Sequence, residues 1–557
     1  MALNGTLGGR LVDLGRRSRE VLVLSAVTGA LVGVAVAAFE WITAEEVLET
    51  VLGWPLALQV LAPGVGLALT AVALRFVGRD VSPATSDAYI ENFHQPERRL
   101  DLAKVPARLA ASVATLGFGG ALGLEGPSMY LGAATGSTLQ RRFPRLFSAG
   151  AGKVLMVAGA AAGVAAIFKA PATGTVFALE VPYQDDTARR MLLPALVASA
   201  SSYLVFVAIN DTAPLFPTGG TPPFALRELG GALVLGLLCG GLARMFAAVA
   251  RAAKRIQTAV GPVRRVVAAG VLLAILLLAA HAATGESLTL GPGYNLIDWL
   301  RDSPSSGLVA LVLVLRVAAT ATTLAGGGAG GLFIPLVLMG ALSGQIVGTA
   351  LDESITVLFP VVGVAAFLGA GYRTPLAAVM FVAETTGRPG FIVPGLLAAV
   401  TSQLVMGDAS VSDYQESGRV GHLERRFRLP LTTAIRTDVL TVPPDATLDE
   451  LVWHHMLHSR QTAACVVDGS TYRGLVRLED LAEIGRERWN ETLVGDIARR
   501  DLPTARPSWT LEEAVDAMQA ADLALFPVTD AEQGFVGIVT LNDAIRLDEI
   551  LRRTHET

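Results

Sequence analysis

The order of hydrophobic and polar positions divides the chain near residue 418. Before this point, apolar runs of about 20 residues recur, which is the length that a membrane-spanning helix needs. Several of these runs cover residues 21–39, 56–76, 230–249, 265–283 and 308–324. The pattern predicts an all-helical, multi-pass membrane domain over residues 21–417, preceded by a short cytosolic segment at 1–20.

Composition and charge agree with this prediction. The chain is 52% hydrophobic and 17% charged, with a mean hydropathy of +0.51, so most of it faces lipid or a very large core. The net charge of −5 does not favour a nucleic-acid partner. Four arginines precede the first apolar run and predict a cytoplasmic N-terminus in the plasma membrane. They are Arg10, Arg16, Arg17 and Arg19.

Two further classes of protein are disfavoured. A membrane zinc protease needs an H-E-x-x-H motif, which the sequence lacks, and the histidines have no metal-ligand spacing. A cation transporter needs acidic residues along its pore, and the apolar runs contain few carboxylates. We therefore expect neither an enzyme nor a required cofactor, and a cation transporter that carries a regulatory tail is the less favoured alternative.

The polar tail contains an internal repeat. A basic linker, 418–430, leads into two segments, 431–490 and 491–557, that align at an offset of 63 residues: ATLDELVWHHM with WTLEEAVDAMQ, and YRGLVRLEDL with FVGIVTLNDA. Each copy reads as an extended lead-in, a helix, two short strands and a closing helix. The tail is therefore predicted to be a cytoplasmic pair of α/β domains.

The apolar part also repeats. FKAPATGTVFALE (168–180) matches YRTPLAAVMFVAE (372–384) at an offset of 204, and GLEGP (123–127) matches GLFIP (331–335) at 208. Two structural repeats are predicted, at roughly 21–210 and 226–417. Gly/Pro-interrupted helices at matching places in two repeats are typical of a binding site at mid-membrane.

The two bends, 123–127 and 331–335, have the chemistry of an anion site. A glycine-rich turn followed by proline begins a helix, and a helix that begins inside a membrane exposes unpaired N–H groups and the positive end of its dipole. An anion satisfies both. Close packing through small residues is the alternative for each glycine. The candidate anion ligands in the first bend are Gly123, Leu124 and Gly126.

Glu125 lies inside the first bend. Its carboxylate can reach the same amides as an anion, so we predict that it acts as a gate, occupying the anion's place when charged and leaving when protonated or displaced. A structural role, as a carboxylate at a helix start, is the alternative.

The segments GLEGPSMYLGA, GLFIP, LGPGYNLI and VAETT together resemble the CLC chloride channels and transporters. The resemblance implies an inverted-repeat fold, a homodimer with one chloride path in each subunit, and Glu125 as the gating glutamate. It assigns the anion ligands of the second bend to the backbone amides of Leu332, Phe333 and Ile334. It also implies that Tyr414 is the inner-gate tyrosine, although a tyrosine at the membrane interface is the alternative.

Two departures from the family pattern bear on function. The family's first anion-binding turn is absent, so Ala84, Thr85 or Ser86 must take its place. The inner proton acceptor of family exchangers aligns with Val181, which cannot hold a proton. This favours a passive channel over the alternative, a chloride/proton antiporter of the same fold. Glu180, repeated as Glu384, is predicted to have a shared structural role near a helix end.

The tail resembles a pair of CBS modules, in which a G-x-x-T-x-x-D pattern often binds an adenine nucleotide. Thr540 and Asp543 complete this pattern in the second copy, whereas Arg477 and Asp480 occupy the matching positions in the first. A nucleotide at these residues is one hypothesis. Capping of the last helix by the same side chains is the other.

Overall fold

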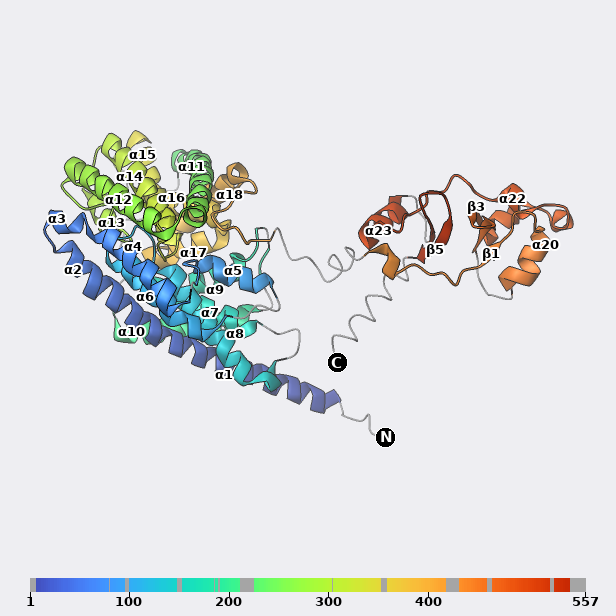
Figure 1. The fold of residues 1–557 in the computed structure, drawn as a ribbon, viewed down its shortest axis with the longest axis horizontal. Coiled ribbons are helices and arrows are strands. Elements are labelled where there is room, and N and C mark those ends of the chain that lie inside the picture. The colour runs from blue at the N-terminus through green and yellow to red at the C-terminus, as the bar shows by residue number, and fades with distance from the viewer. Residues whose placement is uncertain are drawn as a thin grey trace. The chain divides into compact units, whose positions relative to one another are not determined.

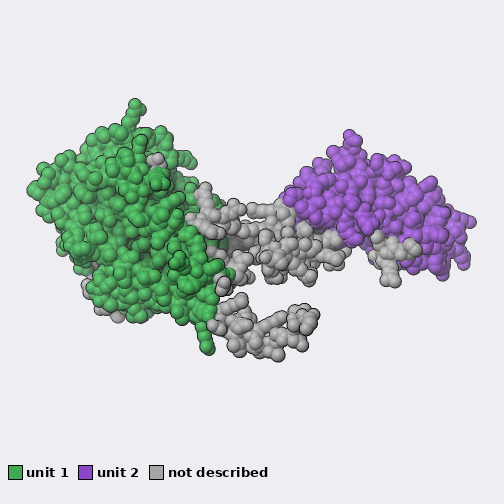
Figure 2. All heavy atoms as spheres, turned by 60° about the horizontal axis from the view of Figure 1, so that its bottom comes forward, with its two compact units in different colours: residues 1–419 green, residues 420–557 purple. Residues whose placement is uncertain are grey.

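The computed structural model describes residues 7–79, 81–95, 100–147, 153–184, 186–188, 191–210, 225–302, 304–351, 358–416, 430–457, 463–520 and 525–540. The chain separates into two compact units, residues 1–419 and 420–557, which are coloured separately in Figure 2. We call them the helical unit and the tail unit. Asp543, one of the predicted nucleotide ligands, lies outside the described residues.

The helical unit confirms the all-helical, multi-pass prediction. Among the described residues, eight helices are long and apolar enough to cross a membrane. The helices of the first half are α1 (Leu7–Glu40), α2 (Glu49–Leu52), α3 (Leu56–Gln59), α4 (Ala62–Val72), α5 (Ser86–His94), α6 (Val105–Gly117), α7 (Glu125–Arg142), α8 (Val154–Phe168), α9 (Pro171–Glu180) and α10 (Leu192–Ile209). Those of the second half are α11 (Leu226–Ala259), α12 (Pro262–Thr284), α13 (Tyr294–Arg301), α14 (Ser306–Ala325), α15 (Phe333–Leu351), α16 (Leu358–Tyr372), α17 (Pro375–Thr386) and α18 (Ile392–Met406).

The two halves pack in the same way. In the first, α7 packs on α8, and α1 packs on α8 and α10; in the second, α15 packs on α16, and α11 packs on α16 and α18. Figure 1 colours the first set of helices from blue to blue-green and the second set from green to light orange. This correspondence agrees with the two sequence repeats.

Glycine pairs at equivalent positions allow the closest helix contacts. A Cβ on Gly132 in α7 would collide with the backbone of Gly159 in α8, and the converse also holds. Gly340 in α15 and Gly363 in α16 have the same relationship. In membrane proteins, small residues at helix contacts allow the backbones to approach closely. These four glycines have that packing role, so not every glycine belongs to an anion site.

The tail unit contains two copies of an α/β fold. In the first, β1 runs parallel to β2 and β2 antiparallel to β3; in the second, β4 and β5 are antiparallel. Its elements are β1 (Thr441–Val442), α20 (Leu448–Glu450), β2 (Ala463–Asp468), β3 (Thr471–Arg477), α22 (Val494–Ile497), α23 (Leu511–Ala520), β4 (Leu525–Thr529) and β5 (Phe535–Thr540).

Each copy of the tail pairs its lead-in backbone with the other copy. Arg436 pairs with Ile538 in β5, and Arg499 pairs with Leu475 in β3. Arg499 follows Arg436 by 63 residues, and Ile538 follows Leu475 by 63 residues, which is the offset of the sequence repeat. The two copies therefore form one pseudo-symmetric body.

Candidate functional site

The two glycine-containing bends lie directly against each other. The N–H of Gly123 donates to the carbonyl of Gly331 at 2.9 Å, and the N–H of Gly331 donates back to Gly123 at 2.8 Å. Helix α7 begins at Glu125 and α15 at Phe333, immediately after this pair. Both helix starts are buried, so one helix end from each repeat directs its free amides into the interior of the unit.

The Glu125 carboxylate fills the space in front of these amides. The side chain is 1% exposed, and its Oε1 accepts the N–H of Phe333 at 2.6 Å. It also interacts with its own amide and that of Ile334. Oε2 is buried with no hydrogen-bond partner among the residues that the structure describes. A carboxylate from one repeat thus occupies the helix start of the other.

Glycine is needed at the bends because the carboxylate folds back over them. A Cβ on either Gly123 or Gly331 would collide with the Glu125 carboxylate. A Cβ on Gly126 would press against the Thr85 hydroxyl and lie 3.0 Å from Ser86 Oγ. The three positions therefore hold space for polar groups, a function that small-residue packing does not explain.

A third helix begins at the same place. Helix α5 starts at Ser86, and the hydroxyl of Thr85, the preceding residue, donates to the carbonyl of Gly330 at 3.3 Å. Both side chains are buried. The structure thus brings two of the three predicted substitutes for the missing anion segment to the bends. The backbone N–H of the third, Ala84, instead donates a hydrogen bond to the Ser82 hydroxyl at 3.2 Å.

The hydroxyl beside the second bend belongs to Tyr372, a residue that the sequence analysis did not single out. It accepts the N–H of Leu332 at 3.4 Å and interacts with the Ser86 side chain. Tyr414 is 44% exposed, and its charged neighbours are Asp87, Glu91, Asp413 and Lys254. This position does not match that of a hydroxyl held at the second bend.

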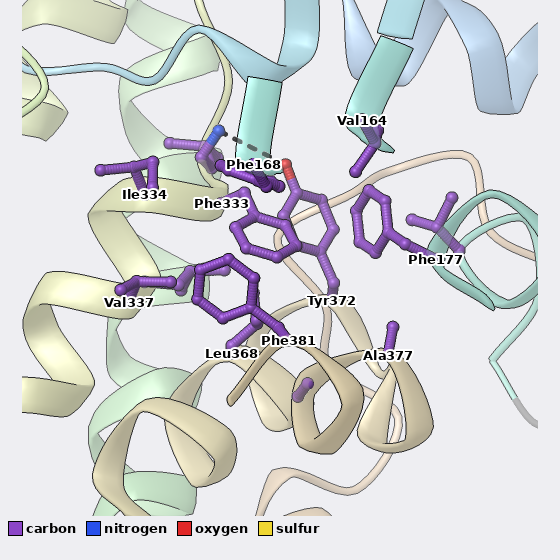
Figure 3. Close-up of a cluster of buried hydrophobic side chains, with 14 of the residues drawn as sticks. Val164, Phe168, Phe177, Phe333, Ile334, Val337, Leu368, Tyr372, Ala377 and Phe381 are labelled. Atoms are coloured by element: carbon purple, nitrogen blue, oxygen red, sulfur yellow. Dashed lines mark hydrogen bonds between the residues drawn. The ribbon is translucent and has the colours of Figure 1, made fainter. Parts of the chain in front are cut away.

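An aromatic cluster lies behind the second bend. The ring of Phe333 packs at centroid distances of 4.4 Å on Phe168, 4.9 Å on Phe381 and 5.1 Å on Phe177, as Figure 3 shows. Tyr372 continues the cluster at 5.4 Å from Phe177. The rings exclude water on this side, which strengthens any interaction between the amides and a charge.

Glu180, Val181 and Glu384 lie at helix ends. Glu180 accepts the amides of Leu376 and Ala377 at the start of α17, and Glu384 accepts those of Ala172 and Thr173 at the start of α9. This confirms the structural role expected of the glutamate pair. Val181, the residue after α9, is fully buried, and its carbonyl accepts the Gln415 side-chain amide at 2.8 Å.

In the tail, Arg477 and Asp480 bind each other. Asp480 accepts the backbone N–H of Arg477 at 2.8 Å and caps a short 3₁₀ helix, Leu478–Glu483. The Arg477 guanidinium contacts the carboxylates of Glu479 and Asp480. For the first copy this favours the capping role over nucleotide binding. In the second copy, Thr540 ends β5.

The fold and the site together define a class: a helical membrane protein of two inverted repeats, whose broken helices meet at a buried carboxylate, followed by paired α/β modules. The family described as Voltage gated chloride channel matches residues 65–407, and the CBS domain matches residues 432–487 and 494–549. The chain belongs to the CLC family, with a CBS domain pair in its tail.

Similar proteins and structures agree with this assignment. The H(+)/Cl(−) exchange transporter ClcA of Salmonella arizonae is 29% identical over 434 residues, which is 72% of this chain and 88% of the relative. A slow cyanobacterial Cl−/H+ antiporter shares the fold, with a TM-score of 0.61 and 21% identity over 69% of this chain and 94% of that one. A eukaryotic CLC transporter matches 94% of this chain and 97% of its own, with a TM-score of 0.58 and 16% identity.

Proposed function

We propose that the chain exchanges chloride for protons across a membrane. The first support is its similarity to proteins named as H(+)/Cl(−) exchange transporters. The second is the buried carboxylate between the two repeats. This proposal replaces the passive channel that Val181 favoured at the sequence level and takes up the antiporter alternative.

The observation that carries the proposal is the 2.6 Å hydrogen bond from the Phe333 amide to Glu125 Oε1. Amides at a buried helix start bind one negative group at a time, because a second one would add charge repulsion and desolvation. The carboxylate and a chloride ion therefore compete for them. Protonation weakens the hold of the amides on Glu125 and releases the site to chloride, which links proton uptake to anion binding.

The chloride ligands in this proposal are neutral groups. The amides of Phe333 and Ile334 and the hydroxyls of Ser86 and Tyr372 lie around the carboxylate or next to it. Dipoles of this kind select a negative ion without the strong hold of a full cationic partner. That property suits an ion that must leave again on every transport cycle.

Flux in liposomes tests the proposal. With a chloride gradient and no initial proton gradient, wild-type protein should drive protons against their electrochemical potential. Glu125→Gln should keep chloride flux and lose proton movement, because a glutamine cannot carry a proton. Glu286→Gln, at an exposed glutamate after α12, is the matched control and should behave as wild type. Proton pumping by Glu125→Gln would overturn the assignment.

Passive chloride conduction is the second candidate, favoured by the buried Val181 at the inner proton position. The reversal potential separates the two. For an exchanger it shifts when pH is changed on one side at fixed chloride, whereas for a pure conductor it stays at the chloride potential.

Three finer proposals accompany the main one. By family resemblance, the chain acts as a homodimer. The arginines before the first apolar run and the basic linker support a location in the plasma membrane with both termini in the cytoplasm, and lipid and chloride are its other partners. We also propose that an adenine nucleotide binds the second tail copy at Thr540 and Asp543. Titration of ATP into the full chain tests this, since Thr540→Ala should weaken binding while Arg477→Ala should not.

A further inference from the structure

Helices α11, α12 and α14 contact one another (Figure 1). An apolar groove opens between them on the helical unit. Its volume is about 530 Å³, and its walls include Val249, Ile256, Leu272 and Ala325. Each of the three helices is long and apolar enough to span a membrane. The natural content of such a groove is therefore a hydrocarbon chain.

One end of the groove is cationic. Arg264 and Arg265 line it from the first turn of α12. Arg264 is exposed, whereas Arg265 is partly buried. Arg265 Nη1 donates to the Gln257 carbonyl at 2.5 Å, but its Nε is buried without a hydrogen-bond partner within the described part of the chain. The guanidinium thus retains a donor for an anionic group.

A second hollow continues past the same arginine. It measures about 910 Å³, lies between α4 and the turn from α11 to α12, and shares Val260 and Arg265 with the groove. It adds Arg75 to the basic groups, together with the apolar side chains of Val72 and Val267. Two apolar hollows that meet at arginines match two acyl chains joined at one phosphate.

We propose that an anionic phospholipid binds here, with its acyl chains in the two hollows and its phosphate on Arg264 and Arg265. The shape suits any phospholipid, but the net positive charge at the junction favours one with a net negative headgroup. The N-terminal end of the α12 dipole adds to this preference.

Arg265 also connects this lipid site to the anion site. Its guanidinium packs against Gly327, where the backbone has φ +88° and an added Cβ would lie 3.1 Å from Arg265 Nη2. Gly327 belongs to the loop that joins α14 to α15 and contains Gly331 of the second bend. A lipid phosphate that draws Arg265 towards the groove changes the support of this loop. The effect on transport rests on the proposed function, whereas lipid binding does not.

Native mass spectrometry of the purified full chain with phosphatidylglycerol tests binding without any transport assay. Wild type should retain phosphatidylglycerol more than phosphatidylcholine. Arg264→Ala should lower retention about fivefold, the change expected for loss of one arginine beside an anionic lipid. Ala268→Leu, which narrows the groove without changing charge, should lower retention as well. Arg255→Ala removes a nearby charge that does not line the groove and should leave retention unchanged.

Flux in liposomes then tests the connection to transport. Chloride flux by wild type should rise when phosphatidylglycerol is added to phosphatidylcholine vesicles, and Arg264→Ala should lose this response. Equal retention of both lipids, or equal losses for Arg255→Ala and Arg264→Ala, would overturn the lipid site. If the protein retains phosphatidylglycerol but chloride flux does not respond to it, the lipid site stands and only its proposed effect on the two bends is overturned.

Discussion

Glu180 and Glu384 each cap the helix that begins in the other repeat. Glu180 Oε2 accepts the Ala377 amide at 2.9 Å, and Glu384 Oε2 accepts the Thr173 amide at 2.7 Å and the Thr173 hydroxyl at 2.6 Å. Each glutamate lies near the end of one helix and satisfies amides at the start of its counterpart, so the same sequence motif acts twice in opposite directions. A carboxylate accepts hydrogen bonds from such amides more strongly than an uncharged oxygen does.

Removing either cap should destabilise the helical unit. Glu180→Ala or Glu384→Ala leaves buried amides without an acceptor, which costs about 1–3 kcal/mol of unfolding free energy. The melting temperature in detergent, followed by tryptophan fluorescence, should fall for both variants. The glutamine variants keep one acceptor oxygen and should fall less. An unchanged melting temperature for both alanine variants would contradict the capping role.

The sequence predicted a shared structural role for the two glutamates and a site built from both bends, because these depend on spacing, but it did not predict that each glutamate caps a helix of the other repeat. The 204-residue offset aligned Glu180 with Glu384, and the 208-residue offset aligned the bends that pair at Gly123 and Gly331. Each repeated element is the start or the end of a helix. The unpaired N–H and C=O groups there need hydrogen-bond partners wherever the helix packs. The fold class and the meeting of the bends therefore follow from local chemistry and internal symmetry.

The Tyr372 hydroxyl beside the second bend did not follow in the same way. The repeat alignment paired Phe168 with Tyr372, but nothing local shows which of two buried aromatic residues points its ring edge at the second bend. That depends on how α16 packs against α15, which is a tertiary property. A tyrosine that replaces phenylalanine at one repeat position was the available signal.

Tyr372→Phe should weaken chloride binding while preserving the aromatic cluster. The hydroxyl contributes one hydrogen bond, worth about 1 kcal/mol, so the apparent chloride affinity should fall about fivefold. Isothermal titration in detergent measures this change. Tyr414→Phe, at the half-exposed tyrosine, should leave affinity unaltered. If Tyr414→Phe lowered the chloride affinity and Tyr372→Phe did not, the hydroxyl that binds chloride would be that of Tyr414.

Gly331→Ala should disturb the gate without removing its carboxylate. The new Cβ collides with Glu125 Oε1, so the side chain must leave its place at the Phe333 amide. Chloride flux should then lose most of its dependence on pH, as in Glu125→Gln.

A double-mutant cycle sharpens this prediction. If the collision acts only through the carboxylate, adding Glu125→Gln to Gly331→Ala should change chloride flux little further. Each change by itself already removes the charged carboxylate from the Phe333 amide. Gly241→Ala in α11, where a Cβ meets nothing within 4 Å, controls for substitution itself. Additive effects of Gly331→Ala and Glu125→Gln would mean that the alanine acts on the backbone of the bend instead.

The thiol of Cys465 offers a pH test of the tail unit. The side chain is 1% exposed in β2, and burial raises its pKa to about 12 from 9.0. The folded tail therefore keeps this proton at a pH where the unfolded chain releases it. The linked stability is complete below pH 9 and is lost as pH rises from 9 towards about 12. With Cys239→Ala to leave a single thiol, iodoacetamide at pH 9 should label the native full chain far more slowly than the urea-unfolded chain. Equal labelling rates would show that the thiol is accessible and its pKa unshifted in the folded tail.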